Sequence, residues 1–273
     1  RAGLQGASAS TGRTRNGDTA VREASTGLLV ELDPGSNVTD LLLEQYAKDP
    51  VQALYSRKGP AGWADVTAQQ FLDQVRALAK GLIAGGITPG ETVAVMSATR
   101  YEWTVVDFAI WFAGGVTVPI YETSSAGQIE WILHDSGARR IFAQDEAKAS
   151  LVRGVLDTSG LLGDTILPVV RMDYDGDAPN LASLAAAGTG VGDAELERHR
   201  SAAALAEVAS HVYTSGTTGL PKAANLNHYR VYGAMLAFSA VMEATEKDRI
   251  YDCLPLYHTS GGVIAVGAAL MVG

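Results

Sequence analysis

Residues 213–222 read Tyr-Thr-Ser-Gly-Thr-Thr-Gly-Leu-Pro-Lys, and this signature organises the interpretation of the whole chain. It follows a short apolar run, Val208 to Tyr213, that has the composition of a buried strand. Glycine lets the backbone approach a ligand closely, and a turn of this kind can direct several backbone N–H groups at an anion. Hydroxyl groups and a lysine add further donors. The residues that we expect to bind phosphate are Thr214, Ser215, Gly216, Thr217, Thr218, Gly219 and Lys222.

The residues alone leave two other interpretations of this signature to weigh. Clusters of glycine, serine and threonine are most often surface turns. A Walker-type phosphate loop requires the pattern G-x-x-x-x-G-K-[ST] running directly into a helix. Gly219 is followed by Leu220-Pro221-Lys222-Ala223, so the Walker spacing is not met. The predicted order is a strand, a phosphate-binding loop and then a helix over residues 229–243.

The composition defines the broad class of protein. Of the 273 residues, 47% are hydrophobic and 19% are charged, which is typical of a globular protein with one large or two small domains. The formal net charge of −9 argues against general nucleic-acid binding, which depends on basic patches. Cys253 is the only cysteine, and its apolar neighbours predict a small core residue. A single cysteine makes no intrachain disulfide, and we expect a cytoplasmic protein.

The sequence predicts that the chain consists of an N-terminal leader and a domain. Residues 1–26 are rich in Arg, Ser, Thr and Gly and are predicted to be a disordered leader, with a transit peptide as the alternative. Residues 27–273 are predicted to form the domain that carries the signature.

The longest apolar run, Phe108 to Tyr121, is interrupted by glycine and proline. It falls short of the roughly 20 residues that span a membrane. Any membrane contact is expected to be peripheral.

Strand and helix patterns alternate before the signature. Short apolar runs predict buried strands, whereas apolar positions at helical spacing after a capping residue such as Thr67 or Ser125 predict helices. The predicted strands span residues 51–57, 63–66, 91–98, 116–120, 140–143, 165–171 and 208–213. The predicted helices span residues 41–48, 68–84, 101–112, 126–133, 146–156 and 194–205. This alternation predicts an α/β fold with mostly parallel sheets flanked by helices.

The same pattern places two polar segments at one edge of the sheet. After the signature, a strand is predicted at residues 249–254, followed by a turn at 255–262 and a last apolar helix. In an open parallel sheet, ligands bind outside the carboxyl ends of the strands. The loop at Thr214 and the turn at Tyr257-His258 both follow predicted strands. We therefore expect the two segments to share one crevice.

The signature resembles, nearly letter for letter, the Y-T-S-G-T-T-G-x-P-K motif of the adenylate-forming (AMP-binding) enzymes. These include acyl- and aryl-CoA synthetases, luciferases and peptide-synthetase adenylation domains, and the resemblance covers residues 38–273. Segments 101–112 and 116–125 look like bacterial long-chain fatty acyl-CoA ligases. Segments 219–224 and 251–258 look more like very-long-chain acyl-CoA synthetases and fatty acid transport proteins. Fatty acyl substrates are common to both branches.

This resemblance implies a reaction and its cofactors. Family members join a carboxylic acid to the α-phosphate of ATP, release pyrophosphate, and pass the acyl group to coenzyme A. The seven residues given above would then bind the phosphates of ATP, with Mg²⁺ as the accompanying ion. The turn would border the passage for the acyl and pantetheine groups through Tyr257, His258, Thr259 and Gly261. The alternative is that this turn only packs on the core. His228 is expected to cap a helix or to pack against its neighbours.

The resemblance also implies that the chain is part of a longer protein. We expect an incomplete N-terminal part of the adenylation domain, with the C-terminal domain and its catalytic lysine beyond Gly273. On that basis no catalytic residue and no metal-ligand cluster is expected here, and the fragment alone is expected to be inactive. Two alternatives stay open. One is a non-catalytic nucleotide- or acyl-binding protein, and the other is an enzyme that adenylates aryl or amino acids.

Overall fold

The computed structural model describes residues 8–13, 19–25, 32–59, 61–160, 168–214 and 220–273. The chain divides into two compact units, one up to Asp33 and the other from Pro34 to Gly273. All of the predicted site residues belong to the second unit.

The first unit contains an antiparallel hairpin. It is formed by β1 (Ser8–Arg13) and β2 (Thr19–Ser25). The prediction of disorder over residues 1–26 differs from this result at both strands. The sequence between the strands contains Asn16-Gly17, the dipeptide that most strongly favours a tight hairpin turn. The prediction gave this signal no weight.

The second unit is built on a six-stranded sheet in the order β10-β9-β6-β5-β7-β8. Neighbouring strands are parallel except for the antiparallel pair β9 and β10. A separate antiparallel hairpin is formed by β3 and β4. The strands of this unit are β3 (Ala53–Gly59), β4 (Gly62–Thr67), β5 (Thr92–Met96), β6 (Val116–Ile120), β7 (Arg140–Ala143), β8 (Val170–Arg171), β9 (Val208–Thr214) and β10 (Lys222–Asn227).

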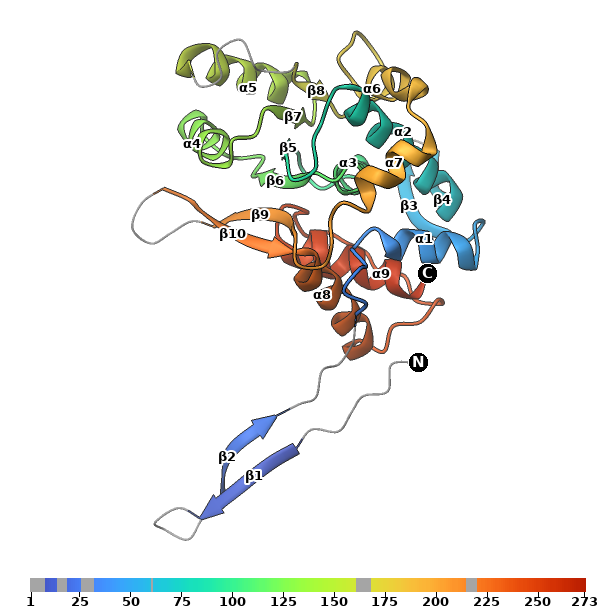
Figure 1. The fold of residues 1–273 in the computed structure, drawn as a ribbon, viewed down its shortest axis with the longest axis vertical. Coiled ribbons are helices and arrows are strands. Elements are labelled where there is room, and N and C mark those ends of the chain that lie inside the picture. Colours follow the sequence, from blue (N-terminus) through green and yellow to red (C-terminus); the bar gives the residue numbers. More distant parts are fainter. Residues whose placement is uncertain (1–7, 14–18, 26–31, 60, 161–167, 215–219) are drawn as a thin grey trace. The chain divides into compact units, whose positions relative to one another are not determined.

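Helices lie on both faces of this sheet (Figure 1). Successive side chains of a strand point to opposite faces, so Ala94 and Met96 of β5 belong to the core formed with α4 and α5. The opposite face is directed towards α3, whose Asp107 and Trp111 bond Thr117 of β6 and Ala209 of β9, and α2 packs on α3. The helices are α1 (Asp40–Lys48), α2 (Ala68–Ala84), α3 (Tyr101–Phe112), α4 (Ala126–Ser136), α5 (Glu146–Ser159), α6 (Leu181–Ala187), α7 (Asp193–Arg200), α8 (His228–Val241) and α9 (Val266–Val272), with a 3-10 turn η2 (Gly188–Gly190) and a π-helix η3 (Ser260–Ala265).

The predicted α/β class with a mostly parallel sheet is confirmed. Several boundaries also agree, because they are set by local signals. Thr67 and Ser125 each form a capping box at the start of α2 and α4, with Gln70 and Gln128 respectively. α3 is buried on nearly every side, as its continuous apolar sequence predicts.

One strand next to the signature was missed. β10 pairs with β9, with Lys222 opposite Thr214, so the signature connects two antiparallel strands and does not lead directly into a helix. The sequence of β10, Lys-Ala-Ala-Asn-Leu-Asn, is rich in residues that disfavour strands. Pairing with the edge of the sheet outweighs this weak intrinsic preference.

Three other predictions need correction. The strand predicted at residues 249–254 is absent: this described segment has no regular structure. Cys253 lies in it and is exposed, so it is not a core residue. Apolar neighbours in sequence indicate burial only when the segment packs, and here no strand pairs with it. The strand predicted at residues 165–171 is represented by β8, and residues 165–167 lie outside the described part of the chain.

Gly81 marks the closest approach of two helices. A Cβ atom there would lie 2.2 Å from the backbone oxygen of Leu184, in α6. We expect Gly81→Ala to lower the free energy of unfolding by about 1–3 kcal/mol, because the helices must separate. At Gly154, in α5, a Cβ would meet nothing within 4 Å, so Gly154→Ala is expected to be stabilising by about 0.5–1 kcal/mol. Urea denaturation measures both changes, and equal effects would contradict the close approach.

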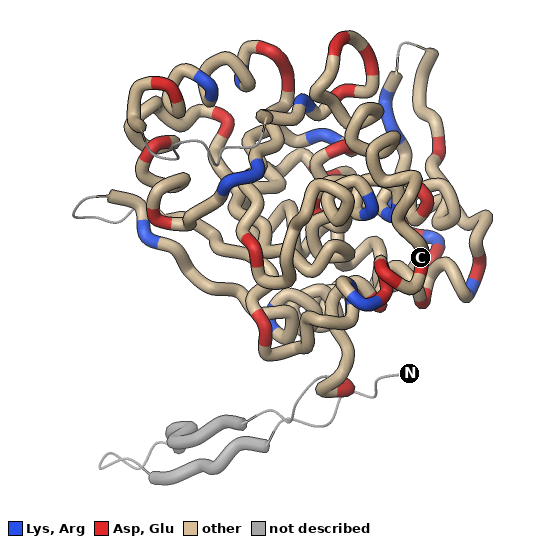
Figure 2. Tube along the Cα trace, turned by 45° about the horizontal axis from the view of Figure 1, so that its top comes forward, with Lys and Arg blue, Asp and Glu red and all other residues tan. Residues whose placement is uncertain are grey.

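Charged residues of both signs are interspersed over the described part of the chain (Figure 2). Among the described residues there is no helix with the length and hydrophobicity needed to cross a membrane.

Candidate functional site

The described part of the chain includes the two ends of the signature. Thr214 is the last residue of β9 and Lys222 is the first residue of β10, and the two are paired across the ladder. The other five residues predicted to bind phosphate lie outside the described residues, namely Ser215, Gly216, Thr217, Thr218 and Gly219. The prediction for these five is therefore neither confirmed nor contradicted.

Thr214 and Lys222 are accessible to a ligand. Both are exposed, and within the described residues Lys222 forms no ion pair. β9 runs parallel to β6, so Thr214 stands at the carboxyl edge of the parallel strands. This is the edge at which open α/β sheets bind ligands.

The turn after residue 254 is fixed by its own backbone. The N–H of His258 donates to the carbonyl of Pro255 at 3.1 Å, and the N–H groups of Gly261 and Gly262 donate to the carbonyl of His258 at 3.1 and 2.9 Å. A Cβ on Gly261 would lie 2.6 Å from the oxygen of Pro255, so the tight turn requires glycine. Tyr257 is half-buried, whereas His258 and Thr259 are exposed.

An aromatic side chain connects this turn to the signature. Tyr121 stacks on Tyr257 with ring centroids 4.5 Å apart, and its centroid is 5.0 Å from that of His258. The hydroxyl of Tyr121 donates to the carbonyl of Tyr213 at 3.2 Å, one residue before Thr214. These contacts bring the turn close to the residue before Thr214, although the turn does not follow a strand. The prediction that the two segments share one crevice stays a prediction.

Sequence reasoning missed Tyr121 as a site residue. It directly follows β6, at the same carboxyl edge as Thr214. The rule that placed the other segments at this edge would also have selected Tyr121. Burial raises the pKa of the Tyr121 hydroxyl, which therefore stays protonated at neutral pH and can donate its hydrogen bond.

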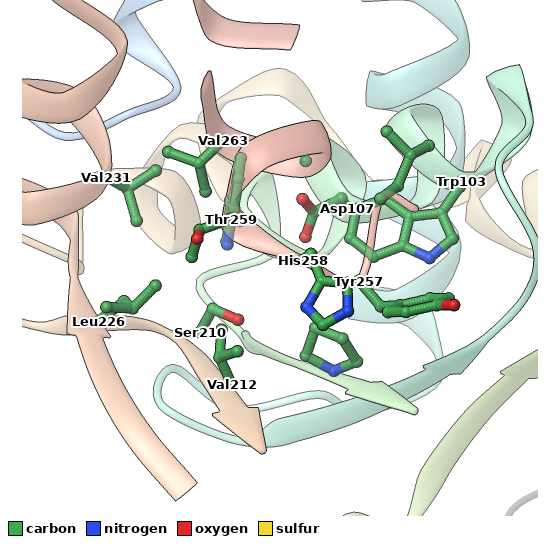
Figure 3. A pocket seen from close by; sticks show the side chains of 14 residues that line it. Trp103, Asp107, Ser210, Val212, Leu226, Val231, Tyr257, His258, Thr259 and Val263 are labelled. Atoms are coloured by element: carbon green, nitrogen blue, oxygen red, sulfur yellow. The ribbon is translucent and has the colours of Figure 1, made fainter. Parts of the chain in front are cut away.

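A small cavity lies beside the turn (Figure 3). Its free volume of about 20 Å³ is sufficient for one water molecule. Its polar lining includes Asp107, Ser210, His258 and Thr259. Residues of the predicted acyl and CoA passage and residues of α3 thus meet at one small space.

Asp107 is the ionisable group buried at this cavity. Burial raises the pKa of its carboxyl group to about 7. The hydroxyl of Thr117 donates to Oδ1 at 2.5 Å, and no cationic side chain among the described residues forms an ion pair with it. Trp103, one turn earlier on α3, has a buried Nε1 that lacks a hydrogen-bond partner among the described residues. Sequence analysis had assigned α3 to the core and proposed no role for either residue.

A much larger cavity shares Leu256 with the small cavity. Its volume is about 1330 Å³, and its walls come from β3 and β4 together with residues 98–102 and 244–252. The described residues predicted to bind phosphate or to border the passage do not line it. In the described ranges, no cluster of three or more His, Cys, Asp or Glu side chains is arranged to bind a metal ion.

His228, which begins α8, has a structural role. It is 1% exposed, and the N–H of Val38 donates to its Nδ1 at 3.4 Å. Burial lowers its pKa to about 4, so the ring is neutral at physiological pH. The prediction that His228 packs is confirmed.

The fold and the signature define the class of protein. Residues 43–273 match the family of AMP-binding enzymes, so the chain belongs to that family. The chain is 36% identical over 255 residues to the long-chain-fatty-acid–CoA ligase FadD15 of Mycobacterium tuberculosis, covering 91% of this chain and 41% of that protein. It is 32% identical over 199 residues to human long-chain fatty acid transport protein 1, covering 69% of this chain and 29% of that protein.

A solved structure supports the fold. A protein of Rhodopseudomonas palustris, described as a long-chain-fatty-acid CoA ligase, superposes with a TM-score of 0.72 at 20% identity, over 87% of this chain and 56% of that one. Both branches anticipated from the sequence, long-chain ligases and fatty acid transport proteins, are thus among the relatives. The chain spans less than half the length of either curated relative.

Proposed function

We propose that this chain supplies the ATP phosphate-binding segment, and one wall of the acyl and CoA passage, of an AMP-forming ligase that activates long- or very-long-chain fatty acids. The observation that carries the proposal is the contact of Tyr121 with both segments. It stacks on Tyr257 and donates to the carbonyl next to Thr214. These contacts support a site in which the proposed passage residues lie close to the first residues of the proposed phosphate-binding segment.

The chemistry explains why such residues are needed. A carboxylate oxygen attacks the α-phosphorus of ATP, and the bond from that phosphorus to the pyrophosphate oxygen breaks. Both reactants are anionic, so donors and cations that neutralise the leaving pyrophosphate lower the barrier. In the second step the thiol sulfur of CoA attacks the acyl carbon and AMP leaves. Mg²⁺ enters this proposal as the ion that accompanies ATP.

Lys222 offers a direct test with this chain. Binding is the appropriate readout, because the chain covers 41% of the mycobacterial relative. We expect saturable binding of MgATP, and Lys222→Gln should weaken it by about tenfold, since a hydrogen bond to a charged group contributes roughly 1.5–3 kcal/mol. Isothermal titration calorimetry measures the dissociation constants.

Lys58→Gln is the matched control for that measurement. Lys58 is an exposed lysine of β3, so this variant removes the same charge away from the signature and should bind MgATP like the wild type. An equal loss in the two variants would mean that Lys222 acts only through net charge. The absence of saturable MgATP binding by the wild-type chain would contradict the proposed nucleotide site.

The identity of the acid needs a second measurement. Fatty, aryl and amino acids are all substrates within the superfamily that the signature resembles. Changes in tryptophan fluorescence on titration with a panel of saturated fatty acids, benzoate and amino acids, in the presence of MgATP, would rank them. The proposal expects the fatty acids to bind with the highest affinity. Preference for benzoate or an amino acid would favour the aryl or amino-acid alternative.

A further inference from the structure

The helix α4 is held in position by its two ends and by its buried face. Its capping box at Ser125 closes the first turn, and Gly137 ends it in the left-handed conformation, with φ of 66°. Ile129, Ile132 and Leu133 pack into the core beneath the sheet. α4 is therefore held at both ends and along its buried face.

Two polar groups on this helix form hydrogen bonds with Tyr213 and Pro221, near the two ends of the signature. Trp131 Nε1 donates to the carbonyl of Pro221 at 2.8 Å, directly before β10. Asp135 Oδ2 accepts a hydrogen bond from the hydroxyl of Tyr213 at 2.6 Å, near the end of β9. Residues four positions apart lie on the same face of a helix, so one face of α4 contacts the signature near both of its ends.

These contacts matter because they lie at the open end of the β9–β10 ladder, opposite the end where β10 leads into α8. β10 is the edge strand of the sheet, with β9 as its only neighbour in the strand order. Its first four residues are exposed. Pro221 precedes the first residue pair of the ladder, Lys222 with Thr214. The indole of Trp131 thus fixes the backbone where the ladder ends, next to the charged side chain that the proposed function assigns to phosphate.

We propose that Trp131 and Asp135 are positioning residues for Thr214 and Lys222, the described residues at the two ends of the proposed phosphate-binding segment. They set the separation and direction of its two ends, and hence the position from which Thr214 and Lys222 meet the polyphosphate of a nucleotide. This inference rests on the proposed function for its ligand, MgATP. Its structural part, the anchoring of the ends of β9 and β10 by α4, stands independently of that ligand.

Trp111 provides a matched control for Trp131. Its Nε1 donates to the carbonyl of Ala209 at 2.9 Å, so it makes the same kind of hydrogen bond to the other end of β9. Trp111→Phe and Trp131→Phe each remove one indole N–H and keep an aromatic ring. Trp111 is 2% exposed whereas Trp131 is only partly buried, so Trp111→Phe should lower the melting temperature more.

The experiment measures amide hydrogen exchange and MgATP affinity on the 273-residue chain. Trp131→Phe is expected to speed exchange in residues 222–227 by about tenfold and to weaken MgATP binding by about five- to tenfold, as the loss of one hydrogen bond predicts. Trp111→Phe should leave MgATP affinity within twofold of the wild type. A purely structural role for Trp131 would give the opposite order, with affinity following melting temperature.

Two substitutions of Asp135 test the same inference, because one removes the hydrogen-bond acceptor and the other retains it. Asp135→Leu removes the acceptor for Tyr213 and should resemble Trp131→Phe, whereas Asp135→Asn retains an acceptor oxygen and should resemble the wild type. Wild-type exchange over residues 222–227 in both Trp131→Phe and Asp135→Leu would overturn the inference. If the wild-type chain failed to bind MgATP, the proposed function would fall, and the exchange measurements would still decide the anchoring.

Discussion

Asp107→Asn is expected to stabilise the protein strongly at alkaline pH and only weakly at acidic pH. Asp107 is 5% exposed, and burial raises its pKa from 3.8 to about 7. Below pH 4 both the folded and the unfolded states hold the proton. Between pH 4 and 7 only the folded state binds it, so stability falls as the pH rises. Above pH 7 the carboxylate is charged in both states, and the folded state carries the full cost of burying it.

The size of this effect follows from the difference in pKa. Each unit corresponds to about 1.4 kcal/mol, so the advantage of asparagine should grow by about 3 kcal/mol between pH 5 and 8.5. The amide oxygen of asparagine can still accept the hydrogen bond from Thr117. Urea denaturation of the wild type and the variant at both pH values gives the two differences in unfolding free energy.

An exposed aspartate serves as the control for this comparison. Asp157 lies on the solvent side of α5, so Asp157→Asn removes a carboxylate without relieving a buried charge. Its difference from the wild type should stay nearly constant over the same pH range. A constant difference for Asp107→Asn as well would mean that this carboxyl group is better solvated than its burial indicates.

The parts of the fold that could be predicted from the sequence are those with local causes. The continuous apolar run from Tyr101 to Phe112 predicts a buried helix, because the helix would have no polar face to expose to solvent. Thr67 and Ser125 precede helices and find their own capping partners three residues later. In these segments intrinsic preference and tertiary packing agree, so the pattern is sufficient.

The errors arise where the pairing of one strand with another decides the outcome. Lys222 to Asn227 has poor strand preference and becomes a strand because β9 offers an open edge. Residues 249–254 have good strand preference, yet no strand pairs with them. Exposure of Cys253 follows from the same lack of packing.

The candidate site also contains residues that the sequence alone predicts and residues that only the fold brings to it. The signature allows phosphate-binding residues to be predicted because the residues concerned follow one another in the sequence, and their role stays a prediction. Tyr121 and Trp131 reach it across 92 and 90 positions of chain, respectively. Nothing in the residues around either of them indicates which carbonyl they will meet. Such contacts become visible only when the sheet order places β6, α4 and β9 together.

Replacing Thr217 or Thr218 by alanine is expected to slow adenylate formation by about 100-fold, the loss found when one preorganised donor is removed from a charge-stabilising site. The physical reason is that charge on the leaving pyrophosphate grows in the transition state, so a hydroxyl aimed at it contributes more there than in the bound substrate. The effect should therefore fall mainly on kcat, with a smaller change in KM for ATP.

ATP–pyrophosphate exchange measures this step without the transfer to CoA. It requires a complete enzyme, made by joining this chain to the part of the M. tuberculosis relative that it does not cover. Thr189 is an exposed threonine of η2 whose hydroxyl donates to the carbonyl of Ala186 at 3.0 Å. Thr189→Ala controls for the loss of a hydroxyl elsewhere. If exchange proceeds at the unmutated rate in both variants, these hydroxyls have no part in stabilising the transition state. If KM for ATP rises while kcat is unchanged, they hold the nucleotide equally in the ground and transition states, and the backbone N–H groups and Lys222 must then account for stabilisation of the leaving pyrophosphate.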